Sequence, residues 1–152
     1  MPETGPPVDA PAPPSARRFE RALIVDDSYL DRLALKRACS QAGLRFAFDE
    51  AASLADFSTA LTADRPDLVF LDIHLGDGTG LDALRLIRSR AAGAPPAVVM
   101  VSDQDDPVVA AEAFKLGCHD YIEKSGLTAA SVNHAVSAAY AARSARVSAA
   151  GR

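Results

Sequence analysis

The segment Leu68-Val-Phe-Leu-Asp72-Ile-His-Leu-Gly-Asp-Gly-Thr-Gly80 combines an apolar run, an acid and a glycine-rich loop. A short apolar run with turn-forming residues after it is typical of a strand that is buried on both faces of a parallel sheet. We therefore predict a strand at 68–71, with Asp72 at its carboxyl end. Ligands of open α/β sheets bind at that edge. Asp72 is a candidate nucleophile or metal ligand, although an isolated Asp here can simply cap the following turn.

Similar segments recur along the chain and alternate with helical patterns. Further strands are predicted at 21–25, 45–49, 97–102 and 120–124. Helices are predicted from Ser28 to Gly43, between Leu54 and Leu61, from Ala83 towards Gly93, from Asp106 to Gly117, and after Thr128. In the first of these helices, Asp31 is expected to share the core-facing stripe with Leu35 and Cys39. This alternation predicts an α/β fold: a doubly wound, five-stranded parallel sheet with helices on both faces.

Polar side chains follow or end four of the predicted strands: Asp26, Asp27, Asp72, Ser102 and Lys124. Parallel strands end at one edge of the sheet, so we expect these side chains to gather. Carboxylates that are brought together repel one another, and Mg²⁺ offsets their charge while keeping positions for phosphate oxygens. A Lys and a hydroxyl suit the oxygens of a phosphoryl group. The set is typical of a site that attaches a phosphoryl group to a carboxylate, with Asp72 as the nucleophile.

The composition predicts one domain with a tail at each end. The chain has 152 residues, of which 49% are hydrophobic, enough for one core and little more. Six of the ten prolines fall in the first fourteen residues, so 1–20 is expected to be a disordered, Pro-rich tail. The domain is expected to span 21–143. Residues 144–152 are expected to form an Ala-rich tail or a frayed helix end.

Charge and cysteine content limit the partners and the compartment. The net charge of -4 and the pI of about 5.3 argue against a nucleic-acid surface, which needs clustered cations. Cys39 and Cys118 lack metal-type spacing, which favours free thiols in a reducing compartment. The first twenty residues lack the apolar core of a signal peptide, and no run reaches membrane-spanning length. We expect a cytoplasmic protein that binds neither nucleic acid nor membrane.

Over 21–143 the chain resembles the receiver domain of response regulators in two-component signalling, of the single-domain chemotaxis type. The matching features are the pair Asp26-Asp27, the context Leu71-Asp72-Ile-His-Leu with Gly78 to Leu81 after it, Ser102, Tyr121 and Lys124. The chemotaxis member of this family is a known example of the flavodoxin-like strand order 2-1-3-4-5. The resemblance implies the same order here.

The resemblance also implies a role for each matching residue. Asp72 would take a phosphoryl group from the phosphohistidine of a sensor histidine kinase. Asp27, Asp72 and the backbone carbonyl of His74 would hold Mg²⁺, and Asp26 would act on it directly or through water. Lys124 would pair with the phosphoryl oxygens. The protein would then be a switch, and would catalyse only its own phosphorylation and dephosphorylation.

Two further residues are implied to carry the signal outward. Ser102 would move to hydrogen-bond the phosphoryl group. Tyr121 would turn inward as Ser102 moves. This turn would change the surface made by the helix after Asp106, the strand at 120–124 and the last helix. A downstream protein would recognise that surface.

Tyr29, Leu30 and Leu33 lie off the main stripe of their helix and next to the acidic pair. They could form an apolar ridge on which the kinase docks, or they could be ordinary, partly exposed residues. The sequence leaves both readings open.

Three positions depart from the pattern of the family. Ser125 follows Lys124 where a proline in a cis bond is usual, and a cis bond before another residue costs about 2.5–4 kcal/mol. A trans bond could place Lys124 differently. Gly76 replaces a common proline and is expected to loosen its loop. Asp103 follows Ser102 where a small residue is usual, and its charge would oppose an incoming phosphoryl group or reposition the attacking water.

Several functions remain open at this point. The leading expectation is a stand-alone regulator with no output domain after the last helix, acting through protein contacts. A relay intermediate would instead pass the phosphoryl group to a histidine phosphotransfer protein. A phosphatase of the haloacid-dehalogenase type also uses a strand-end Asp with Mg²⁺, but His74 occupies the position where its second acid is usual. A receiver that works without phosphorylation is the last alternative.

Overall fold

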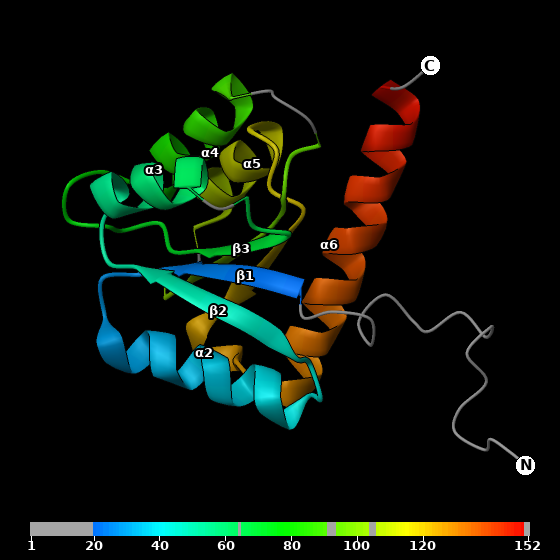
Figure 1. Ribbon diagram of the computed structural model, residues 1–152. Coiled ribbons are helices and arrows are strands. Elements are labelled where there is room, and N and C mark those ends of the chain that lie inside the picture. Colours follow the sequence, from blue (N-terminus) through cyan, green and yellow to red (C-terminus); the bar gives the residue numbers. More distant parts are fainter. Residues whose placement is uncertain (1–19, 64, 91–93, 104–105, 151–152) are drawn as a thin grey trace, which may run out of the picture.

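The computed structural model describes residues 20–63, 65–90, 94–103 and 106–150 (Figure 1). The tail predicted at 1–20 lies outside these residues except for Glu20, with which the first strand begins. The strands are β1 Glu20–Val25, β2 Phe46–Ala51, β3 Leu68–Leu71, β4 Ala97–Ser102 and β5 Asp120–Glu123. The helices are α2 Tyr29–Gln41, α3 Leu54–Ala63, α4 Gly80–Ser89, α5 Pro107–Lys115, the 3₁₀ turn η1 Lys124–Gly126 and α6 Ala129–Ala150.

The strands form one parallel sheet in the order β2-β1-β3-β4-β5. The predicted α/β fold, with its strand order 2-1-3-4-5, is therefore confirmed. β1 lies between β2 and β3, and it pairs Ile24 with Phe70 and Val25 with Leu71. The chain reverses its direction of winding between β1 and β3, which is the point where open α/β sheets bind ligands.

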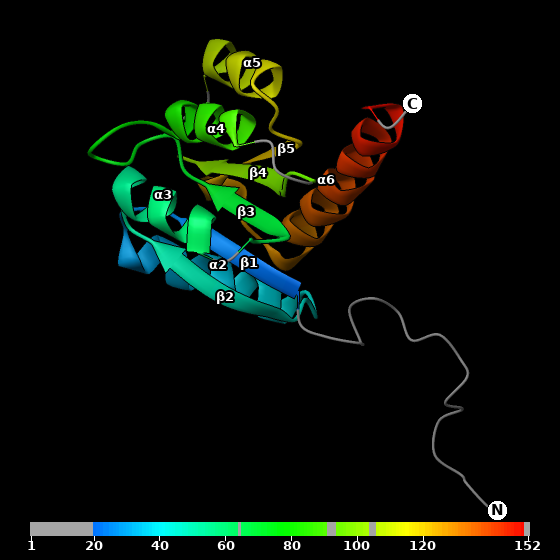
Figure 2. The same cartoon turned by 45° about the horizontal axis from the view of Figure 1, so that its top comes forward.

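Helices cover both faces of the sheet (Figures 1 and 2). α2 and α6 pack on one face, where Leu35, Cys39 and Val132 join strand residues such as Ile24 and Phe70 in one core. α3, α4 and α5 pack on the other face, in a second core that includes Phe57, Leu84 and Ala113. β3 and β4 are buried along their whole length, as apolar strands covered on both sides must be.

Side-chain caps begin the helices at the positions that the sequence predicts. Ser28 accepts a hydrogen bond from the Asp31 N–H at the start of α2, and Asp106 caps α5 ahead of Pro107. Thr128 and Ser131 exchange backbone-to-side-chain hydrogen bonds of 2.9 and 3.0 Å before α6. Each cap satisfies a backbone N–H that the first helical turn leaves unpaired.

The last helix extends beyond Arg143. The sequence predicts an Ala-rich tail or a frayed helix end at 144–152, and α6 continues through this segment to Ala150. Alanine is the best helix former, and the Ala-rich sequence there sustains the helix. None of the helices in the described part of the chain combines the length and apolar character needed to cross a membrane.

Candidate functional site

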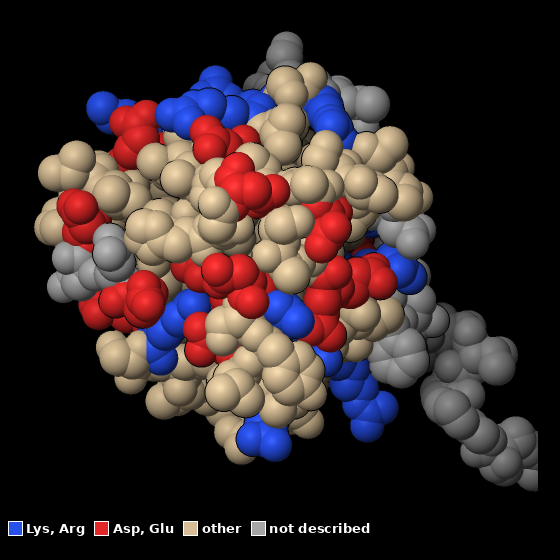
Figure 3. All heavy atoms as spheres, turned by 90° about the vertical axis from the view of Figure 1, so that its left-hand side faces the viewer, with Lys and Arg blue, Asp and Glu red and all other residues tan. Residues whose placement is uncertain are grey.

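The polar residues that the sequence places at strand ends meet at the carboxyl edge of the sheet. Asp26 and Asp27 follow β1, Asp72 follows β3, Ser102 ends β4 and Lys124 follows β5. Figure 3 faces this edge and shows acidic side chains gathered across its middle, with a few basic ones among them. The site therefore lies in the crevice between β1 and β3, with β4 and β5 completing it.

Lys124 is the hub of the site. Its ammonium lies 2.8 Å from Asp26 Oδ2, 3.0 Å from Asp72 Oδ2 and 2.7 Å from Asp31 Oδ2. The Asp26 and Asp72 residues are only 5% exposed, so both pairs are shielded from water. All peptide bonds of the described residues are trans. Lys124 thus reaches Asp72 with a trans Lys124-Ser125 bond and with no proline after Lys124.

Asp31 is the residue of this site that the sequence analysis missed. The periodicity of the sequence places Asp31 on the core-facing stripe of its helix, but the buried residues of α2 are Leu35, Ala38 and Cys39. The Asp31 side chain is 44% exposed and turns to Lys124 instead. Its position in the chain is the signal that points to it. Asp31 lies in the first turn of the helix that follows the acidic pair, and such a turn lies at the same edge of the sheet as the pair.

Burial and pairing set the charge state of the site. Burial raises the pKa of Asp26, although hydrogen bonds from Lys124 and from the Ser28 N–H act to lower it. Burial also acts to lower the pKa of Lys124, but its hydrogen bonds with Asp26, Asp31 and Asp72 outweigh this and raise the pKa above its ordinary value. Lys124 is therefore a permanent cation in this environment.

The donor set fits a divalent cation. Carboxylate oxygens of Asp26, Asp27 and Asp72 lie within 4.8 Å of one another. Asp72 Oδ1 is buried and has no hydrogen-bond partner, while Oδ2 of the same carboxylate is held by Lys124. Asp27 is exposed at the mouth of the site. An unsatisfied buried carboxylate oxygen beside two more carboxylates is the oxygen-rich environment that Mg²⁺ prefers.

The loop after Asp72 is anchored at both ends. A Cβ on Gly80 would collide with the backbone oxygen of Asp72 and would lie 3.0 Å from Met100 Cε, so only glycine lets α4 begin this close to the site. Gly76 has a φ of +77°, a conformation that favours glycine. The Asp77 carboxylate accepts hydrogen bonds from the Leu54 and Ala55 N–H groups and so caps α3. These backbone bonds lower the pKa of Asp77.

Ser102 and Tyr121 lie on neighbouring strands beside the site. Ser102 is fully buried at the end of β4 and pairs with Glu123 of β5. Tyr121 pairs with Met100 and packs partly buried against the core beneath α3, α4 and α5.

The remaining predicted residues lie around the rim. His74 is exposed, and its backbone pairs with Thr79 in an isolated bridge. Tyr29 is 63% and Leu30 71% exposed, whereas Leu33 is partly buried. Asp103, next to Ser102, is exposed.

Comparison with known proteins decides the family. The family model of the response regulator receiver domain matches residues 22–136. The chain belongs to the response regulator receiver domain family. The match covers every strand-end residue of the site, and it favours the receiver over the haloacid-dehalogenase alternative.

Curated and solved relatives agree with this receiver assignment. The chain is 34% identical over 104 residues to the sensory transduction protein LytT of Bacillus cereus, and 32% identical over 104 residues to the transcriptional regulatory protein LytR of Staphylococcus aureus. Each match covers 68% of this chain and 41% of the relative, so the chain spans about two fifths of the length of these relatives.

A solved structure with the same fold is the CheY-like response regulator receiver domain protein of Methanospirillum hungatei. The TM-score is 0.70 at 18% identity, and the match covers 85% of this chain and 99% of that one. This likeness supports the receiver fold of the chain.

Proposed function

We propose that Asp72 of this receiver domain accepts a phosphoryl group from a phosphohistidine, carried by a sensor histidine kinase or by a histidine phosphotransfer protein. The observation that carries the proposal is the state of the Asp72 carboxylate. One oxygen is held by Lys124 at 3.0 Å, and the other is buried without a partner. A carboxylate held in this way is oriented for attack and keeps an oxygen available for a ligand.

The chemistry is an in-line phosphoryl transfer. A carboxylate oxygen of Asp72 attacks phosphorus, the bond from phosphorus to the histidine nitrogen breaks, and that nitrogen keeps the electron pair of the broken bond. Lys124 then releases the Asp72 carboxylate and pairs with the oxygens of the transferred phosphoryl group. These oxygens carry more negative charge than the carboxylate does. Mg²⁺, held by Asp26, Asp27, Asp72 and the backbone carbonyl of His74, would neutralise charge on the same oxygens.

We also propose that the signal leaves through the surface of α5, β5 and α6. Ser102 would move to the phosphoryl group, and Tyr121 would turn inward in response. A hollow of about 400 Å³ between these elements supports this output surface, and Tyr121, His134 and Ala135 are among its lining residues. A movement of Tyr121 would change the shape of the hollow, so a partner protein could distinguish the two states.

The setting of the protein is part of the same proposal. Both cysteines are free and buried, which suits the reducing conditions of the cytoplasm. We propose that Tyr29, Leu30 and Leu33 contact the kinase, since the exposed apolar side chains of Tyr29 and Leu30 lie beside the acidic pair. The expectation of no nucleic-acid partner stays a prediction, because the curated relatives are longer proteins and one is named a transcriptional regulatory protein.

Labelling by a small phosphodonor tests the phosphoacceptor directly. Wild type and Asp72→Asn are incubated with phosphoramidate, with Mg²⁺ or with a chelator, and intact mass is measured. We expect one added phosphoryl group in wild type with Mg²⁺ only, and none in Asp72→Asn. Asp56→Asn, an exposed acid on α3, is the matched control and should label like wild type. Equal labelling of Asp72→Asn would refute the proposal.

A further inference from the structure

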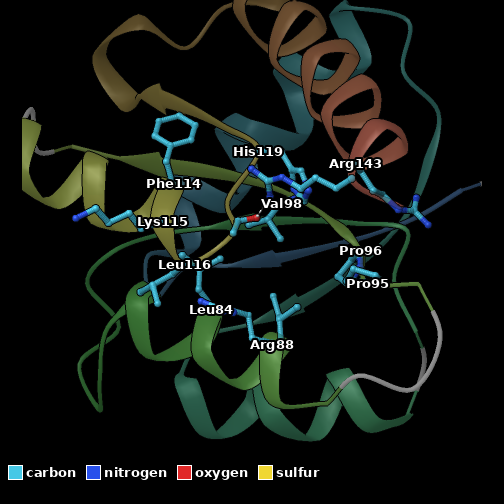
Figure 4. Close-up of a pocket in the computed structure, with 13 residues that line it drawn as sticks. Leu84, Arg88, Pro95, Pro96, Val98, Phe114, Lys115, Leu116, His119 and Arg143 are labelled. Carbon is cyan, nitrogen blue, oxygen red and sulfur yellow. Dashed lines mark hydrogen bonds between the residues drawn. The ribbon is translucent and has the colours of Figure 1, made fainter. Parts of the chain in front are cut away.

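A second cavity lies at the opposite edge of the sheet from Asp72. It has a volume of about 490 Å³, within the range of small-molecule sites. Figure 4 shows its labelled walls: Leu84 and Arg88 of α4 on one side, Pro95 and Pro96 ahead of β4 on another, and Arg143 of α6 opposite α4. The turn after α5 closes the remaining side with Leu116. None of these residues belongs to the phosphoacceptor site.

The lining of the cavity combines apolar side chains with several cations and no acid. Leu84, Ile87, Val98 and Leu116 contribute apolar surface, and the cations in the lining are Arg88, Lys115, Arg143 and Arg146. None of the described residues that line it is an Asp or a Glu. Four cations therefore gather around one cavity in a chain whose net charge is -4.

Helix ends explain two of these cations and leave two unexplained. Arg88 and Lys115 lie in the last turns of α4 and α5, where the helix dipole favours positive charge. Arg143 and Arg146 lie within α6, before its last turn, so the dipole gives no reason for them. Within the described ranges, no carboxylate lies at ion-pair distance from any of the four.

Two observations place the guanidinium groups of Arg146 and Arg143 at the wall of the cavity. Arg146 donates a hydrogen bond of 3.0 Å to the backbone oxygen of Gly117, which fixes its guanidinium against the lining. His119 lines the same cavity, and burial, followed by the charges of Arg146 and Arg143, lowers its pKa. His119 therefore stays neutral and leaves the guanidinium groups as the charged features of this wall.

We propose that this cavity binds a small organic anion with an apolar body. The body would lie against Leu84, Ile87 and Leu116, and the anionic head would pair with Arg143 and Arg146. An anion at this place would offset the charge of two guanidinium groups that have no carboxylate partner among the described residues and that repel one another. Because α4, α5 and α6 all contribute walls, and α5 and α6 also form the proposed output surface, such a ligand would link a second signal to that surface.

The fluorescent anion 8-anilinonaphthalene-1-sulfonate tests the proposal on the full chain. N-phenyl-1-naphthylamine has the same aromatic body without the sulfonate and serves as the neutral control. We expect the anion to shift the methyl NMR signals of Leu84, Ile87 and Leu116 in the folded protein, and to bind about tenfold more tightly than the neutral compound, as a charge-assisted hydrogen bond allows. Equal affinities, or shifts confined to residues elsewhere, would overturn the proposal.

Arginine variants distinguish specific binding in the cavity from non-specific binding of the dye. Arg143→Gln and Arg146→Gln should each weaken binding of the anion about tenfold, for the same reason, and leave the neutral compound unaffected. Arg37→Gln, an exposed arginine of α2, should bind the anion like wild type. Unchanged binding in both cavity variants would contradict the proposal. A synthetic peptide of Glu and Phe residues that shifts the same signals while the naphthalene sulfonate shifts none would also overturn it, in favour of a protein partner.

Discussion

Lys124 lies closer to Asp31 than to Asp72: its ammonium is 2.7 Å from Asp31 Oδ2 and 3.0 Å from Asp72 Oδ2. Asp26 completes a set of three carboxylates around one cation. A phosphoryl group on Asp72 must therefore compete with Asp31 for the same ammonium. Asp31 is the most exposed of the three acids, so it is the one whose charge can be removed with the least disturbance of the core.

Asp31→Asn should speed labelling of the protein by phosphoramidate. Removing the competing carboxylate leaves Lys124 free to pair with the incoming group and also removes a repelling charge. A partly exposed ion pair is worth about 0.2–1 kcal/mol, which corresponds to a rate about 1.4- to 5-fold higher. The initial rate of mass increase measures the effect. Asp56→Asn should show the rate of wild type, and a slower Asp31→Asn would mean that Asp31 assists Lys124.

Gly80→Ala should destabilise the protein and disturb the site together. Its Cβ would collide with the backbone oxygen of Asp72, and overpacking of this kind costs about 1–3 kcal/mol. Urea denaturation measures the loss, and phosphoramidate labelling should slow in the same variant. Gly126→Ala is the matched control, because an added Cβ there meets nothing within 4 Å, and its stability should change by less than about 0.5 kcal/mol. Equal stability of both variants would show that the loop between Asp72 and Gly80 moves to accommodate the added Cβ.

The sequence predicts the site well where strand ends determine it. Asp26, Asp72, Ser102 and Lys124 end or follow buried strands, and parallel pairing alone brings such positions to one edge. Asp31 lies on a helix, and the rotation of a helix about its own axis follows from how it packs. The burial of Leu35 and Cys39 in the core sets that rotation, whereas an apolar stripe predicts only its approximate direction.

Contacts between separate loops were also beyond the sequence. Asp77 caps α3 across the site through the Leu54 and Ala55 N–H groups, although more than twenty residues separate them along the chain. The cations of the second cavity are a similar case, because α4, α5 and α6 contribute them separately. No local pattern predicts that the ends of α4 and α5 and the middle of α6 will surround one cavity.

Mg²⁺ should stabilise the folded protein through Asp27. A ligand that binds only the native state raises the free energy of unfolding, by about 1.4 kcal/mol when its concentration is ten times its dissociation constant. Urea midpoints with Mg²⁺ and with a chelator measure this gain. Asp27→Asn should lose most of the gain because Asp27 is one of the three clustered carboxylates. Asp56→Asn should keep it, and an undiminished gain in Asp27→Asn would exclude this residue as a ligand.

Leu30→Asp should slow transfer from a sensor kinase while leaving labelling by phosphoramidate unchanged. Leu30 is 71% exposed, so the substitution leaves the core intact and places a charge on the proposed docking surface. An apolar anchor of an interface is commonly worth more than 1 kcal/mol, so we expect transfer about tenfold slower. Val108→Asp, at a site 77% exposed on α5, is the control. Equal transfer rates for all three proteins would remove the docking role of Leu30.

His119 should make the protein less stable as the pH falls. Its Nδ1 accepts a hydrogen bond of 3.0 Å from the Val98 N–H, so protonation of Nδ1 would set two donors against each other. Burial, with smaller contributions from Arg146 and Arg143, lowers the pKa of His119 from 6.5 to about 4. Between these values the unfolded chain binds the extra proton and the folded protein does not. The stability that neutral His119 contributes is therefore fully present above about pH 6.5 and is lost as the pH falls towards about 4.

The loss from His119 alone should be about 2 kcal/mol between roughly pH 7 and pH 5, by the linkage of its two pKa values. Carboxylates also titrate near the lower end of this range, so the wild-type pH dependence must be compared with a variant that lacks only this proton site. His119→Asn is that variant, because its side-chain oxygen can accept from the Val98 N–H and does not titrate. Urea denaturation should give a flatter pH profile for His119→Asn than for wild type. Parallel profiles would show that the pKa of His119 is the same in the folded and the unfolded state. Another group would then cause the loss of stability in acid.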